Sequence, residues 1–204
     1  MPKIIVNAFV TLDGVMQAPG GPDEDRENGF VHGGWQGPLS DEVVGRLVMQ
    51  GFGDADGFVL GRKTYDIFSN YWPKITDPGN AIAVALNSRP KYVASRSLAH
   101  VGWNNAHLIE GDLVAEMRRL RAAPGQTLQT WGSTGLMQTL LQHDLIDELR
   151  MFIFPVVLGS GKRLFGSGTA PAAFKQVEVV PCPQGAVYQR LQRNGAPRYG
   201  EIDA

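Results

Sequence analysis

The chain has 204 residues, 43% hydrophobic and 19% charged, with a formal net charge of −1 and a single cysteine, Cys182. This length allows one well-buried core but is short for two full domains, and no apolar run is long enough to span a bilayer. The near-zero charge excludes the long-range field that draws proteins to nucleic acid or to an anionic membrane, and the lone cysteine excludes an intrachain disulfide, so we expect a cytoplasmic single domain over residues 1–204.

The first predicted element is a buried strand over residues 3–10, which is rich in β-branched and aromatic residues and lacks turn formers. Residues 17–38 follow as a long loop, because glycines and prolines punctuate an acidic stretch without periodicity. The loop has apolar residues with which to pack, so we expect an ordered lid; these residues are Phe30, Val31 and Trp35. Ser40 is the predicted N-cap of the next helix, whose apolar stripe contains Val43, Leu47, Val48 and Phe52.

The rest of the chain alternates strands with helices. The predicted strands are 57–60, 91–94, 107–109, 127–131 and 149–157. Four further helices are predicted. The first runs from residue 61 to near residue 72, the second covers 79–88, the third is marked by the apolar face of Leu113, Met117 and Leu120, and the fourth covers 136–141. Two last strands, near 174–180 and 186–192, flank a Pro-Gln-Gly turn and form an antiparallel hairpin. This order predicts an α/β domain with a mainly parallel sheet and an antiparallel edge.

Residues 61–64, Gly-Arg-Lys-Thr, stand where a short buried strand turns into a helix. Glycine at the strand end lets a ligand approach the backbone, and the helix start offers unpaired N–H groups and a positive dipole to an anion. Arg62 and Lys63 add positive charge, and Thr64 adds a hydroxyl. An arginine beside an adenosine ribose commonly binds the 2′-phosphate of NADP. An ordinary helix start with solvated cations is the alternative explanation.

Residues 132–135, Gly-Ser-Thr-Gly, again place small residues and hydroxyls between a strand and a helix, where a pyrophosphate can sit on backbone donors. A tight turn that needs glycine for its conformation also explains this segment. Ligands of open α/β sheets collect at the carboxyl ends of the strands. Two such turns at that edge together favour a nucleotide.

Two other patterns predict no site. Residues 159–162, Gly-Ser-Gly-Lys, resemble the end of a P-loop, but Val156 stands at the first glycine position and Arg163 replaces the hydroxyl residue after the lysine. The four histidines show no metal-ligand spacing, and we expect each to be a surface or capping residue; they are His32, His100, His107 and His143. The sequence therefore predicts no metal site.

With these segments identified, the chain resembles the family that contains dihydrofolate reductase and the reductase domain of bacterial riboflavin biosynthesis. The resemblance covers nearly the whole length, and its most specific part is similar to the riboflavin-type reductases and their uncharacterised relatives. The segments that carry it are residues 11–14, 61–65, 131–133, 145–149, 155–162 and 164–165. It implies a dihydrofolate reductase-like fold, with a mostly parallel twisted sheet, flanking helices and a C-terminal antiparallel hairpin, and it implies NADPH as the cofactor.

The resemblance also implies roles for individual residues. After Gly61, the residues that would hold the adenosine-side phosphates are Arg62, Lys63 and Thr64. Ser95 and Arg96 would flank the adenine and its 2′-phosphate. The pyrophosphate would meet Gly132, Ser133, Thr134 and Gly135. The residues beside the nicotinamide would be Ala8, Val15, Met16 and Gln17. Gln17 would also face the substrate, and the other candidates for its pocket, for which a plain core role is the alternative, are Trp35, Tyr65 and Phe68.

The predicted reaction is hydride transfer from NADPH to a C=N or C=O carbon of a small, flat, pterin- or pyrimidine-like substrate. The acid that dihydrofolate reductases carry on their first helix has no counterpart, because Gly45 falls at that position and Asp41 and Glu42 lie in the first turn. Asp13 is the best-placed acid in sequence, yet a turn role before Gly14 also explains it. No catalytic residue is therefore assigned.

Two alternatives to this reaction stay open. A non-catalytic NADP-binding or scaffold protein of the same fold would also lack the helix acid. A 5-amino-6-(5-phosphoribosylamino)uracil reductase would need cations that read the substrate phosphate. For the partner, the apolar strand at residues 151–154 and the terminal hairpin fit a homodimer interface, and a strand buried inside one subunit explains the same residues.

Overall fold

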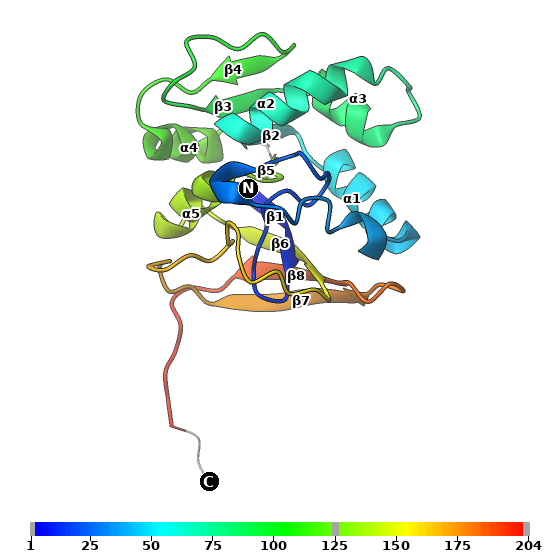
Figure 1. Ribbon diagram of the computed structural model, residues 1–204. Helices are drawn as coiled ribbons and strands as arrows, with labels where there is room; N and C mark the ends of the chain where they lie inside the picture. The colour runs from blue at the N-terminus through cyan, green and yellow to red at the C-terminus, as the bar shows by residue number, and fades with distance from the viewer. Residues whose placement is uncertain (1–2, 124–126, 202–204) are drawn as a thin grey trace.

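The computed structural model describes residues 3–123 and 127–201, in which eight strands form one sheet. The order is β4-β3-β2-β5-β1-β6-β8-β7, from the top of Figure 1 to the bottom. Neighbouring strands are parallel from β4 to β6 and antiparallel beyond it. This confirms the predicted mostly parallel sheet with an antiparallel C-terminal hairpin. The strands are β1 (Lys3–Thr11), β2 (Gly57–Gly61), β3 (Lys91–Ala94), β4 (Ala106–Leu108), β5 (Thr127–Thr130), β6 (Glu148–Phe154), β7 (Phe174–Pro181) and β8 (Val187–Arg193).

Helices cover both faces of the sheet (Figure 1). Along β2, Phe58 and Leu60 pack into the cluster that contains α1 and α3 residues, while Val59 packs into the cluster of α4 and α5. This alternation follows from the two-residue period of a strand, so each face buries its own core. The α-helices are α1 (Glu42–Gly53), α2 (Arg62–Tyr71), α3 (Ala81–Ser88), α4 (Leu113–Ala122) and α5 (Thr134–Gln142), and the 3-10 turns are η1 (Glu27–Gly29), η2 (Gly37–Leu39) and η3 (Trp72–Lys74).

Several predicted boundaries differ from those in the structure, and two of the differences have a clear chemical reason. The N-cap of α1 is Asp41, not Ser40, because the Asp41 carboxylate accepts from the backbone N–H groups of Val43 and Val44 at 2.9 Å. Strand β6 ends at Phe154 rather than at residue 157. Pro155 follows, and proline has no N–H to continue the ladder.

Residues 17–38 form a loop, here called the lid, whose base is packed into the core. Phe30 and Trp35 are buried, as predicted, but Val31 is 81% exposed and holds nothing in place. Gln17 pins the loop from inside, because its Nε2 donates to the carbonyls of Asp25 and Glu27 at 3.1 Å. Buried aromatic side chains and a buried amide thus hold the base of the lid in place.

The apolar strand β6 lies between β1 and β8, which accounts for its sequence within one subunit. On the edge strand β7, Val177 and Val179 are 40% and 41% exposed. The predicted homodimer stays a prediction. No helix in residues 3–123 and 127–201 has both the length and the apolar character that crossing a membrane requires.

Candidate functional site

A cleft of about 910 Å³ opens at the carboxyl ends of β1, β2, β3 and β5. This is the edge at which ligands of open α/β sheets bind. In Figure 1 the lid is the blue segment that crosses the front of the molecule below α2. The lid contributes a wall of the cleft through Gln17, Ala18, Pro19, Glu24 and Asp25.

The structure brings most of the predicted site residues to this cleft. Those that line it are Ala8, Gln17, Gly61, Arg62, Lys63, Thr64, Phe68, Ser95, Arg96, Gly132, Ser133, Thr134 and Gly135. Their placement agrees with the predicted site, and their roles in binding stay predictions.

The two glycine turns, residues 61–64 and 132–135, interlock to form what we call the turn cradle. A Cβ on Gly61 would lie 2.4 Å from Ser133 Oγ, and one on Gly132 would lie 3.1 Å from Thr64 Oγ1. Gly132 has φ +129°, which disfavours any side chain, and Ser133 itself is left-handed at φ 70°. The hydroxyls of Thr64 and Ser133 share a hydrogen bond of 2.6 Å. Each glycine therefore makes room for the hydroxyl of the other turn.

The helices that start at the turn cradle differ from the other α-helices. Asp41, Asn80 and Asp112 accept hydrogen bonds from the first turns of α1, α3 and α4. In α2 and α5, which begin after Gly61 and Ser133, no side chain in the described part of the protein caps the first turn. Helix-terminal N–H groups need an acceptor. The two uncapped helix starts thus leave donors and positive dipoles at the cleft for an anionic ligand.

The predicted adenine-side residues shape the same wall. Arg62 donates to Asp66 at 2.6 Å and to Ser97 Oγ at 3.0 Å, which holds its guanidinium between α2 and the loop after β3. Ser95 Oγ accepts from the N–H groups of Ser97 and Leu98 at 3.2 and 3.1 Å. Arg96 is exposed at the cleft and makes no ion pair with any residue in the ranges described. These arginines supply the local positive charge that a phosphate requires.

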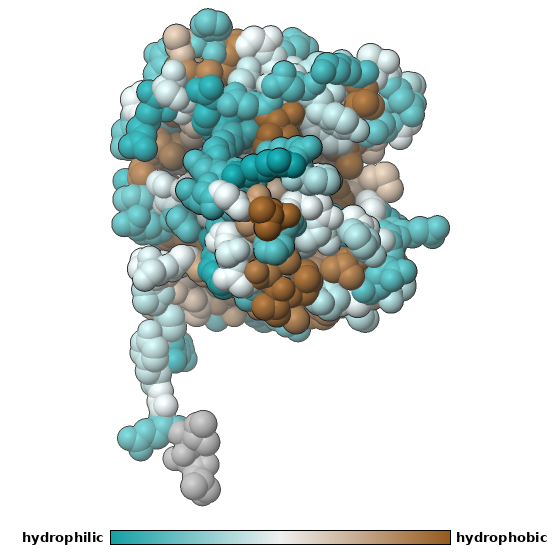
Figure 2. All heavy atoms as spheres, viewed as in Figure 1, coloured by the Kyte–Doolittle hydropathy of each residue, from teal (hydrophilic) through white to brown (hydrophobic). Residues whose placement is uncertain are grey.

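Lys63 is tied to the tip of the lid. Its Nζ lies 3.2 Å from Asp25 Oδ1 and also pairs with Glu27. Lys162, from the glycine-rich loop after β6, pairs with the same two acids, at 2.5 Å from Asp25 Oδ2. Figure 2 shows hydrophilic side chains gathered over the lid and the adjoining end of α2. Two lysines and two carboxylates thus form an ion-pair cluster that joins the lid to α2 and to the loop after β6 beside the cleft, and we call it the lid clasp.

The lid clasp shifts the pKa values of its members. Burial acts to raise the pKa of Asp25, but hydrogen bonds from Lys162 and from the Glu27 N–H hold it below its ordinary value. Hydrogen bonds from Lys162 and Lys63 lower the pKa of Glu27. Burial acts to lower the pKa of Lys63, yet its bonds with Glu27 and Asp25 raise it. All three shifts favour the charged forms, so the clasp is closed near neutral pH.

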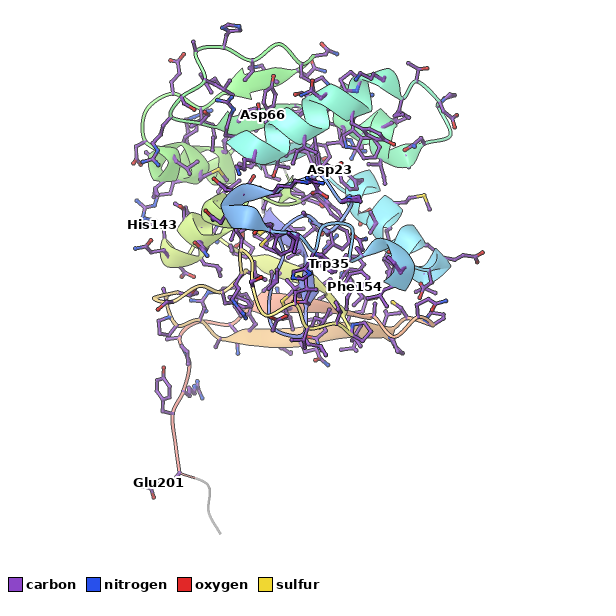
Figure 3. All side chains as sticks on the ribbon, in the orientation of Figure 1. Asp23, Trp35, Asp66, His143, Phe154 and Glu201 are labelled. Atoms are coloured by element: carbon purple, nitrogen blue, oxygen red, sulfur yellow. The ribbon has the colours of Figure 1, made fainter. Side chains whose placement is uncertain are left out.

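Three predicted site residues lie away from the cleft surface. Val15 is fully buried; its backbone bridges to Arg163 and its N–H donates to Thr11 Oγ1, while Met16, predicted beside it, does line the cleft. Figure 3 shows Trp35 beside Phe154, and its ring meets Phe154 edge-on at 5.5 Å. Tyr65 is buried, and its hydroxyl accepts from Gly102 N at 3.0 Å. For both aromatic residues the structure gives the core role that the sequence left open.

Asp13 has a turn role. Its carboxylate accepts from Thr11 Oγ1 at 2.6 Å and from the N–H groups of Leu158 and Gly159 at 3.2 and 2.9 Å. The hydrogen bond from Thr11, more than any other contact, lowers the pKa of Asp13 to about 2. A group with this pKa carries no proton near neutral pH. Asp13 fixes the loop after β6 against the first turn.

Sequence reasoning missed several cleft residues. Glu24 and Asp25 line the cleft from the lid, and Lys162 comes from the segment set aside as a failed P-loop. Asn7 is buried on β1 and also lines the cleft. A readable signal existed only for Asn7, because it is the one polar residue inside the apolar run at residues 4–10. The four histidines are exposed, as predicted, and Figure 3 shows His143 at the outer end of α5.

Comparisons with known proteins agree with this fold. The family model of the RibD C-terminal domain matches residues 2–188. An uncharacterised protein, YyaP of Bacillus subtilis (strain 168), is 30% identical over 169 residues, which cover 80% of each chain. A putative riboflavin biosynthesis protein from Shewanella sp. PV-4 has a TM-score of 0.66 at 23% identity, over 94% of this chain and 99% of that one. Dihydrofolate reductase from Enterococcus faecalis, solved with NADP(H), has a TM-score of 0.59 at 11% identity, over 94% and 96%.

Proposed function

The chain belongs to the RibD C-terminal domain family, and from this premise we propose that it is an NADPH-dependent reductase. Its substrate is a small heterocycle of pterin or pyrimidine type, reduced at a C=N or C=O carbon. The fold shared with a dihydrofolate reductase solved with NADP(H) supports the cofactor assignment. The cytoplasm is the compartment in which we propose that it acts.

One observation carries the proposal, namely the turn cradle with its two uncapped helix starts. The N–H groups at the starts of α2 and α5 would receive the pyrophosphate, and the Ser133 and Thr134 hydroxyls would add donors. Arg62 and Arg96 would take the 2′-phosphate that distinguishes NADPH from NADH. A cradle of this kind serves a pyrophosphate better than it serves a neutral ligand.

The cofactor supplies the hydride, and the protein supplies orientation and exclusion of water. Ala8, Met16 and the base of the lid line the part of the cleft where the nicotinamide would lie. The Asp25–Lys162 ion pair beside it would help to keep water out. Removing water strengthens the electrostatic interactions around a transferring charge.

The reaction also needs a proton, for which Glu24 is the cleft acid best suited. Among the described acids that line the cleft, Asp25 is ion-paired and Asp112 caps α4. Burial raises the pKa of Glu24, against the hydrogen bonds from the Gly20 and Gly21 N–H groups. An acid whose pKa is raised keeps its proton to a higher pH than an ordinary glutamate does, which suits a proton donor. This assigns to the lid the role that a helix acid has in dihydrofolate reductases.

Cofactor binding is tested by titrating the protein with NADPH and with NADH and following nicotinamide fluorescence. We expect tighter binding of NADPH, and a loss of about tenfold or more in NADPH affinity, with little change for NADH, in Arg62→Ala and in Arg96→Ala. Arg119→Ala is the matched control, since Arg119 pairs with Glu116 on α4 and does not line the cleft. Equal affinity for the two cofactors would contradict the proposal.

Turnover separates the reductase from its non-catalytic alternative. Consumption of NADPH is followed against pterins, aminopyrimidines and 5-amino-6-(5-phosphoribosylamino)uracil. Tight NADPH binding without turnover on any of them would leave the non-catalytic NADP-binding protein. For the phosphorylated substrate, Lys162 is the cleft cation on the lid side, and it would have to release Asp25.

A further inference from the structure

A chain of buried amides joins α1, β5 and β1 beside the cleft. Gln129 Nε2 donates to the Gly51 carbonyl at 2.9 Å, and Gln129 Oε1 accepts from Trp131 Nε1 at 3.2 Å. A carbonyl oxygen can only accept, and an indole N–H can only donate. These two partners therefore fix the orientation of the Gln129 amide, with its oxygen shared between Trp131 and Asn7.

The orientation of Gln129 fixes that of Asn7 in turn. Asn7 Nδ2 donates to Gln129 Oε1 at 2.9 Å, so Oδ1 is the end left over. Asn7 is 1% exposed and lines the cleft, yet no donor among the described residues reaches Oδ1. Buried polar atoms of folded proteins nearly always have a hydrogen-bond partner. A donor on a bound ligand is the partner that this cleft can supply.

The side chains around Asn7 suit a flat ligand. Asn7 and Phe9 share one face of β1, and the ring of Phe9 lies 6.1 Å from that of Trp131 between centroids. Trp131 is held flat against Phe52 at 4.2 Å, a position open to it because residue 51 is glycine; a Cβ there would lie 2.7 Å from the indole. Phe9 and Trp131 both line the cleft. A planar ring stacked against them would lie beside Asn7.

We propose that Asn7 Oδ1 accepts a hydrogen bond from a ring N–H or an exocyclic amino group of the substrate. The site then selects heterocycles with a donor edge, such as aminopyrimidines and pterins, over flat acceptor-only carbonyl compounds such as quinones. The inference rests on the proposed reductase function and narrows its substrate class. A buried acceptor built for a substrate N–H rejects analogues that lack it, because the acceptor is then left unpaired.

The test compares the wild type with Asn7→Asp and Asn7→Leu in the presence of saturating NADPH. The probes are 2,4-diaminopyrimidine and 2,4-dimethylpyrimidine, in which methyl groups replace the amino donors at similar size, and binding is measured by calorimetry. We expect the wild type to prefer the diamino probe by about tenfold or more. Asn7→Asp, which keeps an acceptor oxygen, should retain the preference, and Asn7→Leu should lose it.

The aspartate variant separates this role from a structural one. If Asn7 served only to hold Gln129 through Nδ2, both variants would lose that donor and both would bind the two probes alike, which would overturn the inference. A wild type that binds NADPH but does not prefer the diamino probe would overturn it as well, even if Asn7→Leu fails to fold. Failure of the wild type to bind NADPH would instead reject the proposed function, so the two failures are distinguishable.

Discussion

The turn cradle and the lid clasp bound the same cleft but are held together in different ways. In the cradle, a Cβ on Gly61 would clash with Ser133, one on Gly132 would crowd Thr64, and the Thr64 and Ser133 hydroxyls bond at 2.6 Å. In the clasp, Lys63 and Glu27 are 50% and 46% exposed at their side chains, and water screens their attraction. Close packing gives a geometry that salt and pH barely change, whereas exposed ion pairs give a contact that opens easily. A rigid cradle beneath a more weakly held lid tip would suit the proposed reductase, which has to keep its cofactor while it exchanges substrates.

Adding one carbon to the turn cradle should have the largest effect. In Gly61→Ala the new Cβ falls within 2.5 Å of Ser133 Cβ and Oγ, and overpacking of this kind costs about 1–3 kcal/mol. Because the displaced turn carries the proposed pyrophosphate donors, we expect NADPH affinity to fall by more than about a hundredfold, with a lower Tm. Fluorescence titration and thermal unfolding measure the two effects.

The control for this variant is Gly45→Ala on α1, where a Cβ would meet open space. A second substitution should restore the cradle, because Ser133→Gly removes the side-chain atoms with which the added methyl group would clash. If Gly61→Ala with Ser133→Gly binds NADPH no better than Gly61→Ala alone, the interlock is not the reason for the loss.

The next effect in size should come from Glu24, the lid acid that we propose as the proton donor. Glu24→Gln keeps the shape of the side chain but removes its proton, and we expect kcat to fall by about a hundredfold while NADPH affinity is unchanged. In the wild type, a raised pKa means that Glu24 is protonated at low pH and that kcat falls as the pH rises through that pKa. Steady-state kinetics over pH measure both. A Glu24→Gln variant that keeps the same falling limb would show that another group supplies the proton.

How much of this could be predicted from the sequence depends on the range of the interaction. Apolar runs and helix periodicity predicted the strands, the mainly parallel sheet and the terminal hairpin, because these patterns are local. The two glycine turns were also local, and both lie at the cleft. That Gly61 needs to be glycine because of Ser133 could not be predicted, since the clash joins segments far apart in the chain.

The side chains of the substrate end show the same limit. Tyr65 and Phe68 lie three residues apart on α2, yet Phe68 lines the cleft and Tyr65 turns to Gly102. That choice depends on how α2 is rotated against β3, which the amphipathic pattern defines only coarsely. The role of Lys162 could not be predicted, because its segment matches no binding motif and its partners Asp25 and Glu27 belong to a distant loop without periodicity.

Removing the hydrogen bond between the two turns should have a smaller effect than filling their space. In Thr64→Val the shape is kept and the partner of Ser133 Oγ is lost, which should cost about 1 kcal/mol of unfolding free energy and a few-fold in NADPH affinity. Ser133→Ala and the double variant complete a cycle, in which the two single effects should not add. Thr169→Val is the control, because the Thr169 hydroxyl donates to the Gly166 carbonyl at 2.8 Å and does not line the cleft. Additive effects would mean that the two hydroxyls do not depend on each other.

The smallest and most condition-dependent effect should come from the lid clasp. The lowered pKa values of Asp25 and Glu27 mean that the ion pairs stabilise the closed lid fully above the ordinary values of 3.8 and 4.5, and that this stabilisation is lost as the pH falls below them. Raising the salt from about 0.05 M to about 0.5 M should weaken the same contacts near neutral pH.

Tryptic cleavage after Arg26, an exposed lid residue, reports opening near neutral pH. We expect faster cleavage at high salt in the wild type and in Lys162→Met at any salt, since Lys162 pairs with both lid acids. The predicted opening of the lid at low pH is measured by hydrogen exchange of the lid amides, corrected for the intrinsic exchange rate at each pH. The matched control is Lys175→Met, because Lys175 is exposed on β7, far from the clasp in the sequence; Lys91 is unsuitable as a control because it is fully buried. Because the side chains of Lys162 and Asp25 are still 25% and 15% exposed, water weakens their ion pair, and the Tm should fall only slightly while the cleavage rate changes clearly. If neither salt nor Lys162→Met changes the rate of cleavage after Arg26, the lid is held closed by its buried base and not by the clasp. The contrast between the lid clasp and the turn cradle would then disappear.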